Sequence, residues 1–269
     1  MPNDEGNEAR TAGRPRVICH MMTSVDGRIV VEGWPLSGEG SRQYEEVHAT
    51  YAPDAWLCGR VTMEQHFAAG TRSDAEVART YDGPPRADFV APGAAGEHAS
   101  FAIAIDARGK LVWESGEVAE DHVVTVLSER VSDEYLAALR ERGVSYLLAG
   151  RDDVDLPVAL EKIGARLGVR TLVLEGGGGI NGSFLRAALV DEVSLLIAPV
   201  ADGRVGTPAL FDVAGEDAVP CRLTLEDVER RADELLWLRY RVQPHGESTR
   251  RPRTRRPPYA EGRFRCRPT

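Results

Sequence analysis

The segment Leu174–Phe184, LEGGGGINGSF, contains five glycines between the apolar run TLVL (171–174) and the apolar stripe FLRAALV (184–190). A glycine run between a buried strand and a helix lets backbone N–H groups approach an anion closely, and the helix N-terminus adds partial positive charge. A tight turn with positive φ would explain one or two glycines but not five. The segment therefore favours a phosphate-binding loop in an α/β fold.

Strand and helix patterns alternate along most of the chain. Apolar runs predict strands at 17–22, 55–58, 101–105, 122–127, 144–149, 171–175, 193–200, 221–228 and 235–242. Helical patterns occupy 41–51, 61–67, 132–142, 155–167 and 183–190, and Ser132 and Asp155 are good N-caps for two of them. This alternation predicts an α/β layer fold with a mostly parallel central sheet. The last two strands have no helix between them, so we expect an antiparallel C-terminal edge.

The charge distribution divides the chain into a folded body and a tail. The chain has 269 residues, of which 42% are hydrophobic, and a net charge of -9. Residues 243–269 carry a net charge of +6, which leaves -15 on the rest. We expect a flexible N-terminus (1–14), one domain (15–242) and a basic, disordered tail (243–269). Because an acidic body repels phosphates, nucleic-acid binding is unlikely unless the tail acts alone.

Membrane, disulfide and metal signals are not evident in the sequence. No apolar run approaches the roughly 20 residues of a membrane span, and the polar, acidic N-terminus differs from a signal peptide, so we expect a cytoplasmic protein. The six histidines show no HExxH spacing, and the cysteines form no CxxC pair. We therefore expect no metal site and reduced thiols at all four cysteines. These are Cys19, Cys58, Cys221 and Cys266.

The glycine run also matches the dinucleotide pattern GxGxxG at Gly177, Gly179 and Gly182. In a Rossmann fold this pattern follows the first strand, whereas here it follows five earlier strands. The next acidic residues, Asp191 and Glu192, come too early for the usual spacing of roughly 20 residues. A dinucleotide would therefore bind through another architecture.

Four other residues, at three places in the chain, can carry chemistry. Asp26, in SVDGR (24–28), is either part of a turn or a carboxylate in a ligand crevice, at about even odds. Arg60 and Thr62 follow Gly59 in the first turn of a helix, where both can bind phosphate, although the pattern taken alone favours an exposed Arg and an N-cap Thr. Glu175 ends a buried strand beside the glycines, and a buried acid needs a partner or a task.

The order of these elements resembles the reductase domain of riboflavin biosynthesis, the RibD C-terminal family, over roughly residues 15–242. The resemblance rests on the SVDG turn, Trp34 and Ser37, DAWLCGRVT (54–62), LVLEGGGGINGSFLRAALVDEVSLLIAPVADG (172–203) and LLWLRYRV (235–242). It implies a three-layer fold like that of dihydrofolate reductase. It also implies an NADPH-dependent reductase that forms a homodimer.

The resemblance assigns roles to individual residues. Asp26 and Glu175 match catalytic positions in the substrate pocket, where Ser24 and His48 also contact substrate. The expected NADPH contacts are Met22, Trp34, Gly59, Arg60, Thr62, Gly177, Gly178, Gly179, Ile180, Asn181, Gly182 and Ser183. In the family, the ribosyl group of a 5-phosphoribosylamino-pyrimidine is reduced to ribityl.

This sequence departs from the family where the substrate phosphate is bound. His48, in VHATY (47–51), stands where riboflavin enzymes carry an Arg, and TMEQHF (62–67) replaces their T-V-x-x-D-D-P-x-L segment. A shorter, mostly neutral imidazole is a weaker phosphate ligand than a guanidinium. Arg42 or Arg72 would have to compensate, while Arg60 and Arg108 are candidates for the 2′-phosphate of NADPH.

These features predict hydride transfer from NADPH to a C=N or similar double bond, with a proton from water, Asp26 or Glu175. One alternative is a reductase of dihydrofolate or another small molecule. A second is a non-catalytic nucleotide-binding regulator that retains the fold. The long loop 70–100 is expected to be a lid or an oligomer arm, or else disordered.

Overall fold

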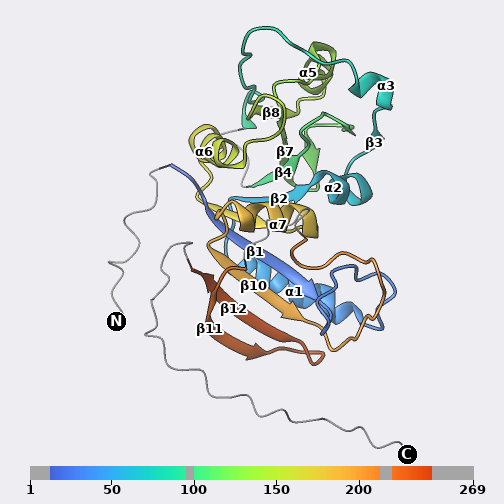
Figure 1. The fold of residues 1–269 in the computed structure, drawn as a ribbon, viewed down its shortest axis with the longest axis vertical. Helices are drawn as coiled ribbons and strands as arrows, with labels where there is room; N and C mark the ends of the chain where they lie inside the picture. The colour runs from blue at the N-terminus through green and yellow to red at the C-terminus, as the bar shows by residue number, and fades with distance from the viewer. Residues whose placement is uncertain (1–12, 95–99, 213–219, 244–269) are drawn as a thin grey trace, which may run out of the picture.

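The computed structural model describes residues 13–94, 100–212 and 220–243 (Figure 1). Most of the predicted flexible N-terminus, the basic tail beyond residue 243 and Cys266 lie outside these residues. Arg14, which we assigned to the N-terminal segment, forms an ion pair with Asp191 over 2.7 Å. The ordered domain therefore includes this residue.

The described residues form a single large sheet flanked by helices. Its strands are β1 (Arg16–Thr23), β2 (Ala55–Gly59), β4 (Phe101–Ile105), β6 (Glu117–Val118), β7 (Asp121–Leu127), β8 (Ser145–Leu148), β9 (Thr171–Leu174), β10 (Glu192–Ile197), β11 (Leu223–Arg230) and β12 (Leu236–Val242). The strand order is β11-β12-β10-β1-β9-β2-β4-β7-β6, and β8 also pairs with β7. Two further strands, β3 (Gly70–Thr71) and β5 (Leu111–Val112), form a separate small ladder.

The predicted mixture of parallel and antiparallel pairing is confirmed. β1 runs parallel to both β9 and β10, and β2, β4, β7 and β8 continue the parallel region. β12 pairs antiparallel with β10 and with β11, which gives the expected C-terminal edge. The opposite edge ends in the short antiparallel strand β6, which the sequence pattern did not predict.

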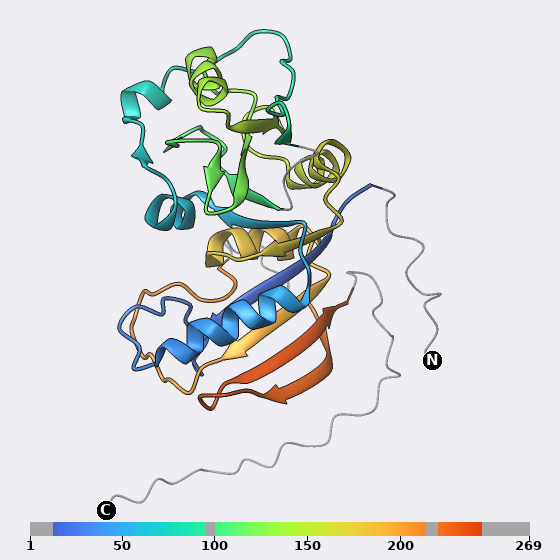
Figure 2. The same ribbon diagram turned by 180° about the vertical axis from the view of Figure 1, so that it is seen from behind.

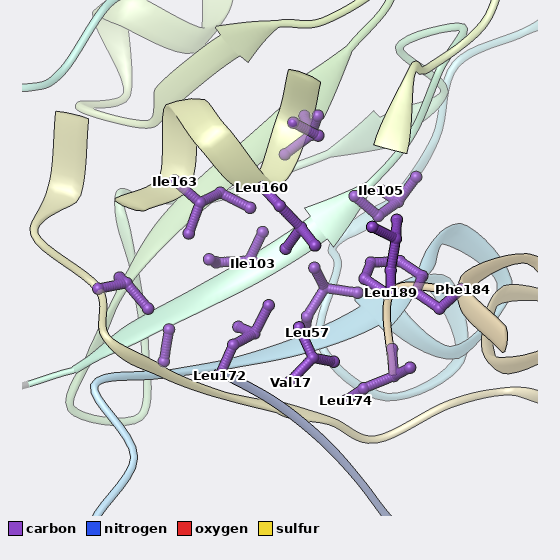
Figure 3. Packing of buried hydrophobic residues seen from close by; sticks show 14 of the residues in the cluster. Val17, Leu57, Ile103, Ile105, Leu160, Ile163, Leu172, Leu174, Phe184 and Leu189 are labelled. Carbon is purple, nitrogen blue, oxygen red and sulfur yellow. The ribbon is translucent and has the colours of Figure 1, made fainter. Parts of the chain in front are cut away.

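Helices cover both faces of the sheet, so the three-layer prediction is also confirmed. They are α1 (Gly38–Thr50), α2 (Arg60–His66), α3 (Asp74–Val77), α5 (Asp133–Glu141), α6 (Leu156–Leu167) and α7 (Gly178–Arg186). Along β2, Ala55 and Leu57 join the buried cluster with α6 and α7, whereas Trp56 and Cys58 join the cluster with α2 and α5. This alternation follows from the two-residue period of a strand. Figure 3 shows the first cluster, in which Leu160 and Phe184 lie near Leu57.

α1 covers the end of the sheet opposite to α5. Val47 on this helix packs with Leu196 of β10 and Trp237 of β12, so the helix lies across β1, β10 and β12 (Figure 2). On the other face, α7 lies over the region of β1, β9 and β2 (Figure 1). The described residues contain no helix that is long and apolar enough to cross a membrane.

Most of the predicted helices and strands are present, but the glycine run and several short elements differ from the prediction. Ser132 and Asp155 cap their helices by accepting hydrogen bonds from the backbone N–H groups of Tyr135 and Val158, each three residues further along. The helix predicted at 183–190 instead begins at Gly178. The glycines can form its first turn because they lack side chains and so pack closely against neighbouring backbone. The predicted loop 70–100 contains β3 and α3, and Phe89 forms a bridge with Tyr146; residues 95–99 are outside the described part.

Candidate active site

Glu175 lies directly after β9, where a largely buried carboxyl group faces α1. The hydroxyl of Tyr44 lies 3.0 Å from Glu175 Oε1 and donates a hydrogen bond to it. His48 Nδ1 lies 3.4 Å from the same oxygen. Burial raises the pKa of Glu175 to about 8, and the hydrogen bond from Tyr44 opposes that rise. Glu175 therefore holds a proton at neutral pH, which makes it a candidate general acid.

The two histidines beside Glu175 are neutral at neutral pH. Burial lowers the pKa of His20 to about 4, and burial also lowers the pKa of His48. His20 is fixed by contacts of Nε2 with the Tyr44 carbonyl oxygen (3.2 Å) and of Nδ1 with Ser194 Oγ (3.0 Å). The contact between His48 and Glu175 thus joins a neutral imidazole to a protonated carboxyl group.

Tyr44, the hydrogen-bond partner of Glu175, lines a cavity of about 500 Å³. Its lining is Met21, Met22, Ile29, Val31, Trp34, Leu36, Ser37, Gly38, Ser41, Tyr44 and Glu45. Tyr44 belongs both to the cavity and to the hydrogen bond with Glu175. A Cβ on Gly176 would lie 3.0 Å from Met21 Sδ, so the cavity also adjoins the glycine turn. The structure therefore places the predicted residues Met22 and Trp34 in the cavity wall, and Glu175 is connected to that wall through Tyr44.

Asp26 lies outside the lining of this cavity and supports it indirectly. Its carboxylate accepts hydrogen bonds from Ser24 Oγ (2.8 Å) and from the backbone N–H groups of Asp202 (2.8 Å) and Gly203 (2.9 Å). These bonds, led by the one from Gly203, lower the pKa of Asp26 to about 2. Asp202 in turn accepts a hydrogen bond from the Trp34 indole over 2.7 Å. Asp26 and Ser24 therefore stabilise the loop that positions Trp34.

The glycine turn places two helix N-termini side by side. Gly59, the N-cap of α2, donates a backbone hydrogen bond to Gly176 O over 2.8 Å, and a Cβ on Gly59 would lie 3.2 Å from Ile180. Gly177, the N-cap of α7, donates to Thr62 Oγ1 over 3.0 Å. Neither N-cap has a side-chain capping bond, and Gly176 has a positive φ of 95°. Uncapped helix N-termini are suited to an anion such as a pyrophosphate.

The remaining residues of the run differ in exposure. A Cβ on Gly178 would lie 2.2 Å from Ala209 O, whereas a Cβ on Gly179 would meet nothing within 4 Å. Asn181 is fully buried and donates from Nδ2 to Leu210 O over 3.1 Å. Thus Gly178 and Asn181 pack against the 209–212 segment, Gly177 donates its N–H to Thr62, and Gly179 is the exposed glycine of the run.

Two other predicted residues are enclosed by α7 itself. Gly182 is buried within the helix, and Ser183 Oγ donates to Gly179 O over 2.9 Å. From the sequence, the whole glycine run was predicted to be one loop, because the pattern does not indicate that a helix begins within it.

The arginines proposed for phosphate binding lie at different places. Arg60 forms an ion pair with Glu64 on α2. Arg108 lines a smaller cavity of about 130 Å³ beyond the ends of β4 and β7, together with Ser128 and Arg130. Both remain near the carboxyl edge of the sheet, where ligands of α/β proteins bind.

The two arginines suggested as substitutes at His48 are already engaged. Arg42 is exposed and pairs with Glu39 and Glu46 on α1. Arg72 donates to Gly109 O over 2.8 Å and lies over the Tyr135 ring, on the α5 side of the molecule. Neither lines the cavity beside Glu175.

Sequence reasoning missed Tyr44, Met21 and Glu45. A signal for Tyr44 was available, because residues four apart share one face of a helix and Tyr44 precedes His48 by four. In the described part of the chain, no group of three or more His, Cys, Asp or Glu side chains is arranged to hold a metal ion.

The sequence of this chain is similar to those of known reductases. The chain is 38% identical over 111 residues to the 2,5-diamino-6-ribosylamino-4(3H)-pyrimidinone 5′-phosphate reductase of Methanothermobacter thermautotrophicus, covering 40% of this chain and 50% of the relative. It is 34% identical over 97 residues to the reductase of the same name from Aquifex aeolicus, covering 36% of this chain and 42% of the relative. The matches thus span about half the length of these curated relatives or less.

Solved structures give the same fold. A pyrimidine reductase-like protein from Corynebacterium diphtheriae superposes with a TM-score of 0.63 at 20% identity, covering 86% of this chain and 92% of that one. RibD from Acinetobacter baumannii superposes with a TM-score of 0.59 at 20% identity, covering 88% of this chain and 60% of that one. The family model described as the RibD C-terminal domain matches residues 15–237. The chain therefore belongs to the RibD C-terminal domain family, with the dihydrofolate reductase-like fold that its sequence predicted.

Proposed function

We propose that the protein is an NADPH-dependent reductase of a small heterocycle of the ribosylamino-pyrimidine kind. The observation that carries the proposal is the protonated Glu175, whose hydrogen-bond partner Tyr44 lines a cavity of about 500 Å³, together with the glycine turn that follows Glu175 and begins α7. The names of the curated relatives, both pyrimidinone phosphate reductases, support the same reaction class.

The chain provides a fitting place for a dinucleotide. The exposed backbone at Gly179 in the first turn of α7, with the N-terminus of α2 beside it, would hold the pyrophosphate. Met22 and Trp34 would contact the nicotinamide side, and Arg60 or Arg108 the 2′-phosphate that distinguishes NADPH from NADH. When bound, the cofactor supplies a hydride to the carbon of a polarised double bond.

The protein's own contribution is orientation and a proton. Apolar side chains form much of the wall around the proposed reacting atoms, and Trp34 is held in position through Asp202. In the proposed reaction, Glu175 gives its proton to the nitrogen of a C=N bond as the carbon is reduced, and solvent then reprotonates the carboxylate. Tyr44, which lines the cavity, fixes the carboxyl group through its hydrogen bond.

The test is NADPH oxidation with 2,5-diamino-6-ribosylamino-4(3H)-pyrimidinone 5′-phosphate, its phosphate-free riboside and dihydrofolate as separate substrates. Oxidation with either pyrimidine supports the proposal. Oxidation with dihydrofolate alone assigns the protein to the other reductase class, and NADPH binding without oxidation of any compound assigns it to the nucleotide-binding regulators. The homodimer implied by the family is tested separately by sedimentation.

A further inference from the structure

The charge of the substrate cavity differs from what a phosphorylated substrate requires. Six of the lining residues are apolar, and Glu45 is the charged residue among those that line the cavity. No Lys or Arg belongs to the lining in the described part of the chain. A phosphate dianion entering this space would lose hydration without gaining a cationic partner.

Nearby arginines on the strand side are bonded elsewhere. Arg28 donates to Thr207 O over 2.6 Å. Arg204 donates to the Asp202 carboxylate and to the backbone oxygens of Val30 and Glu32. Turning either guanidinium into the cavity would leave these acceptors unpaired, which opposes such a movement.

The arginines near α1 are engaged in the same way. Arg42 pairs with Glu39 and Glu46. Arg231 donates to Gln43 over 2.8 Å and pairs with Glu46 and Glu229. The cations of this region thus neutralise carboxylates of the protein itself.

The N-terminus of α1 also borders the cavity, through Ser37 and Gly38, and a helix N-terminus favours anions. This effect is about 0.3–1 kcal/mol at an exposed site. Glu39 in the first turn already occupies that favourable position, and Glu45 repels a second anion. The electrostatic interactions of the described lining residues therefore disfavour binding of a phosphate group in the cavity.

We propose that this site takes an uncharged or cationic heterocycle without a phosphate group, and that Glu45 selects against the phosphorylated form. The inference rests on the proposed reductase function and narrows its substrate class. Tyr44 and Met21, which are not assigned to the cofactor, offer a flat and an adaptable apolar surface, which suit a planar ring.

The experiment compares two ligands that differ only in the phosphate. The full-length protein, saturated with NADP⁺, is titrated in a calorimeter under anaerobic conditions with 2,5-diamino-6-ribosylamino-4(3H)-pyrimidinone 5′-phosphate and with the riboside made from it by phosphatase. We expect the riboside to bind at least tenfold more tightly. The substitution Glu45→Gln should narrow this ratio severalfold.

The matched control is Glu161→Gln, which removes the same charge from an exposed position on α6 and should leave the ratio unchanged. Equal or tighter binding of the 5′-phosphate, or binding of neither compound, overturns the inference. A ratio that does not change in Glu45→Gln overturns the role of Glu45. NADPH oxidation is recorded in parallel. Faster oxidation with the 5′-phosphate than with the riboside would refute the inference about the substrate but support the reductase function. Binding without any oxidation would refute the reductase function, and the ratio of the two affinities would still test the inference about the substrate.

Discussion

The hydroxyl of Tyr44 donates a hydrogen bond to Glu175 over 3.0 Å and so connects α1 to the end of β9. This bond stabilises the ionised form of a carboxyl group that burial otherwise keeps protonated. The pair therefore sets the pH range in which the proposed general acid carries its proton.

Replacing Glu175 with Gln should lower kcat by about 100-fold, because a general acid contributes roughly 10²–10⁴ to the rate. The dissociation constant of NADPH should change little, since the carboxyl group is not among the residues proposed to hold the pyrophosphate. Steady-state kinetics and NADPH titration measure the two effects. An unchanged kcat would show that the proton comes from water.

The pH dependence of kcat in the wild-type enzyme should show a basic limb near pH 8, where Glu175 loses its proton. Tyr44→Phe removes a hydrogen bond that lowers this pKa, so the limb should move to higher pH. Rate measurements from about pH 6 to pH 10 test the shift. A limb that stays in place would mean that the titrating group is not Glu175.

Glu175 should also make stability depend on pH. Its pKa is raised in the folded protein from an ordinary value of 4.5 to about 8, so the folded state holds a proton that the unfolded chain releases in that range. The contribution of this group to stability is fully present below about pH 4.5 and is lost as pH rises through about 8. Denaturant unfolding should therefore show Glu175→Gln gaining stability relative to wild type between pH 5 and pH 8, and a constant difference would contradict the raised pKa.

Asp26→Asn should weaken the structure around Trp34, because an amide nitrogen in place of an oxygen would face a backbone N–H group. We expect a lower melting temperature and a higher KM, with the basic limb near pH 8 retained. The depressed pKa means that Asp26 stabilises the fold above about pH 3.8 and that this stability is lost as pH falls through about 2. Loss of the basic limb in Asp26→Asn would instead place Asp26 in the proton transfer.

Gly178 and Gly179 form a matched pair for separating packing from cofactor binding. An alanine at Gly178 would press on Ala209 O, which should destabilise the protein by about 1–3 kcal/mol. An alanine at Gly179 meets open space in a helix and should stabilise it by about 0.5–1 kcal/mol. NADPH affinity should fall in Gly179→Ala, where the methyl group enters the proposed pyrophosphate site. Unchanged affinity there would move that site elsewhere.

The sequence predicted the layers and the edge of the sheet because they follow from strand periodicity, and β2 shows why. Its alternate residues, such as Leu57 and Cys58, must face opposite layers wherever the strand lies. The start of α7 could not be predicted, because it depends on contact between Gly178 and the distant residue Ala209.

The site was predictable only in part, for the same reason. Glu175 was identified from its place after a buried strand, but its protonated state depends on burial beneath α1. Asp26 could be a turn residue or a crevice carboxylate, and its bonds to Asp202 and Gly203 come from a loop almost 180 residues away. Long-range backbone contacts of this kind leave no local pattern.

The pairing of β1 has a consequence for biosynthesis. This strand ends at Thr23, but its neighbours β9 and β10 begin at Thr171 and Glu192. During translation, β1 therefore has both edges unpaired until most of the chain has emerged from the ribosome. Such late, distant pairing slows folding and exposes an apolar strand to aggregation. The nascent chain is thus expected to need chaperone protection until the centre of its sheet can close.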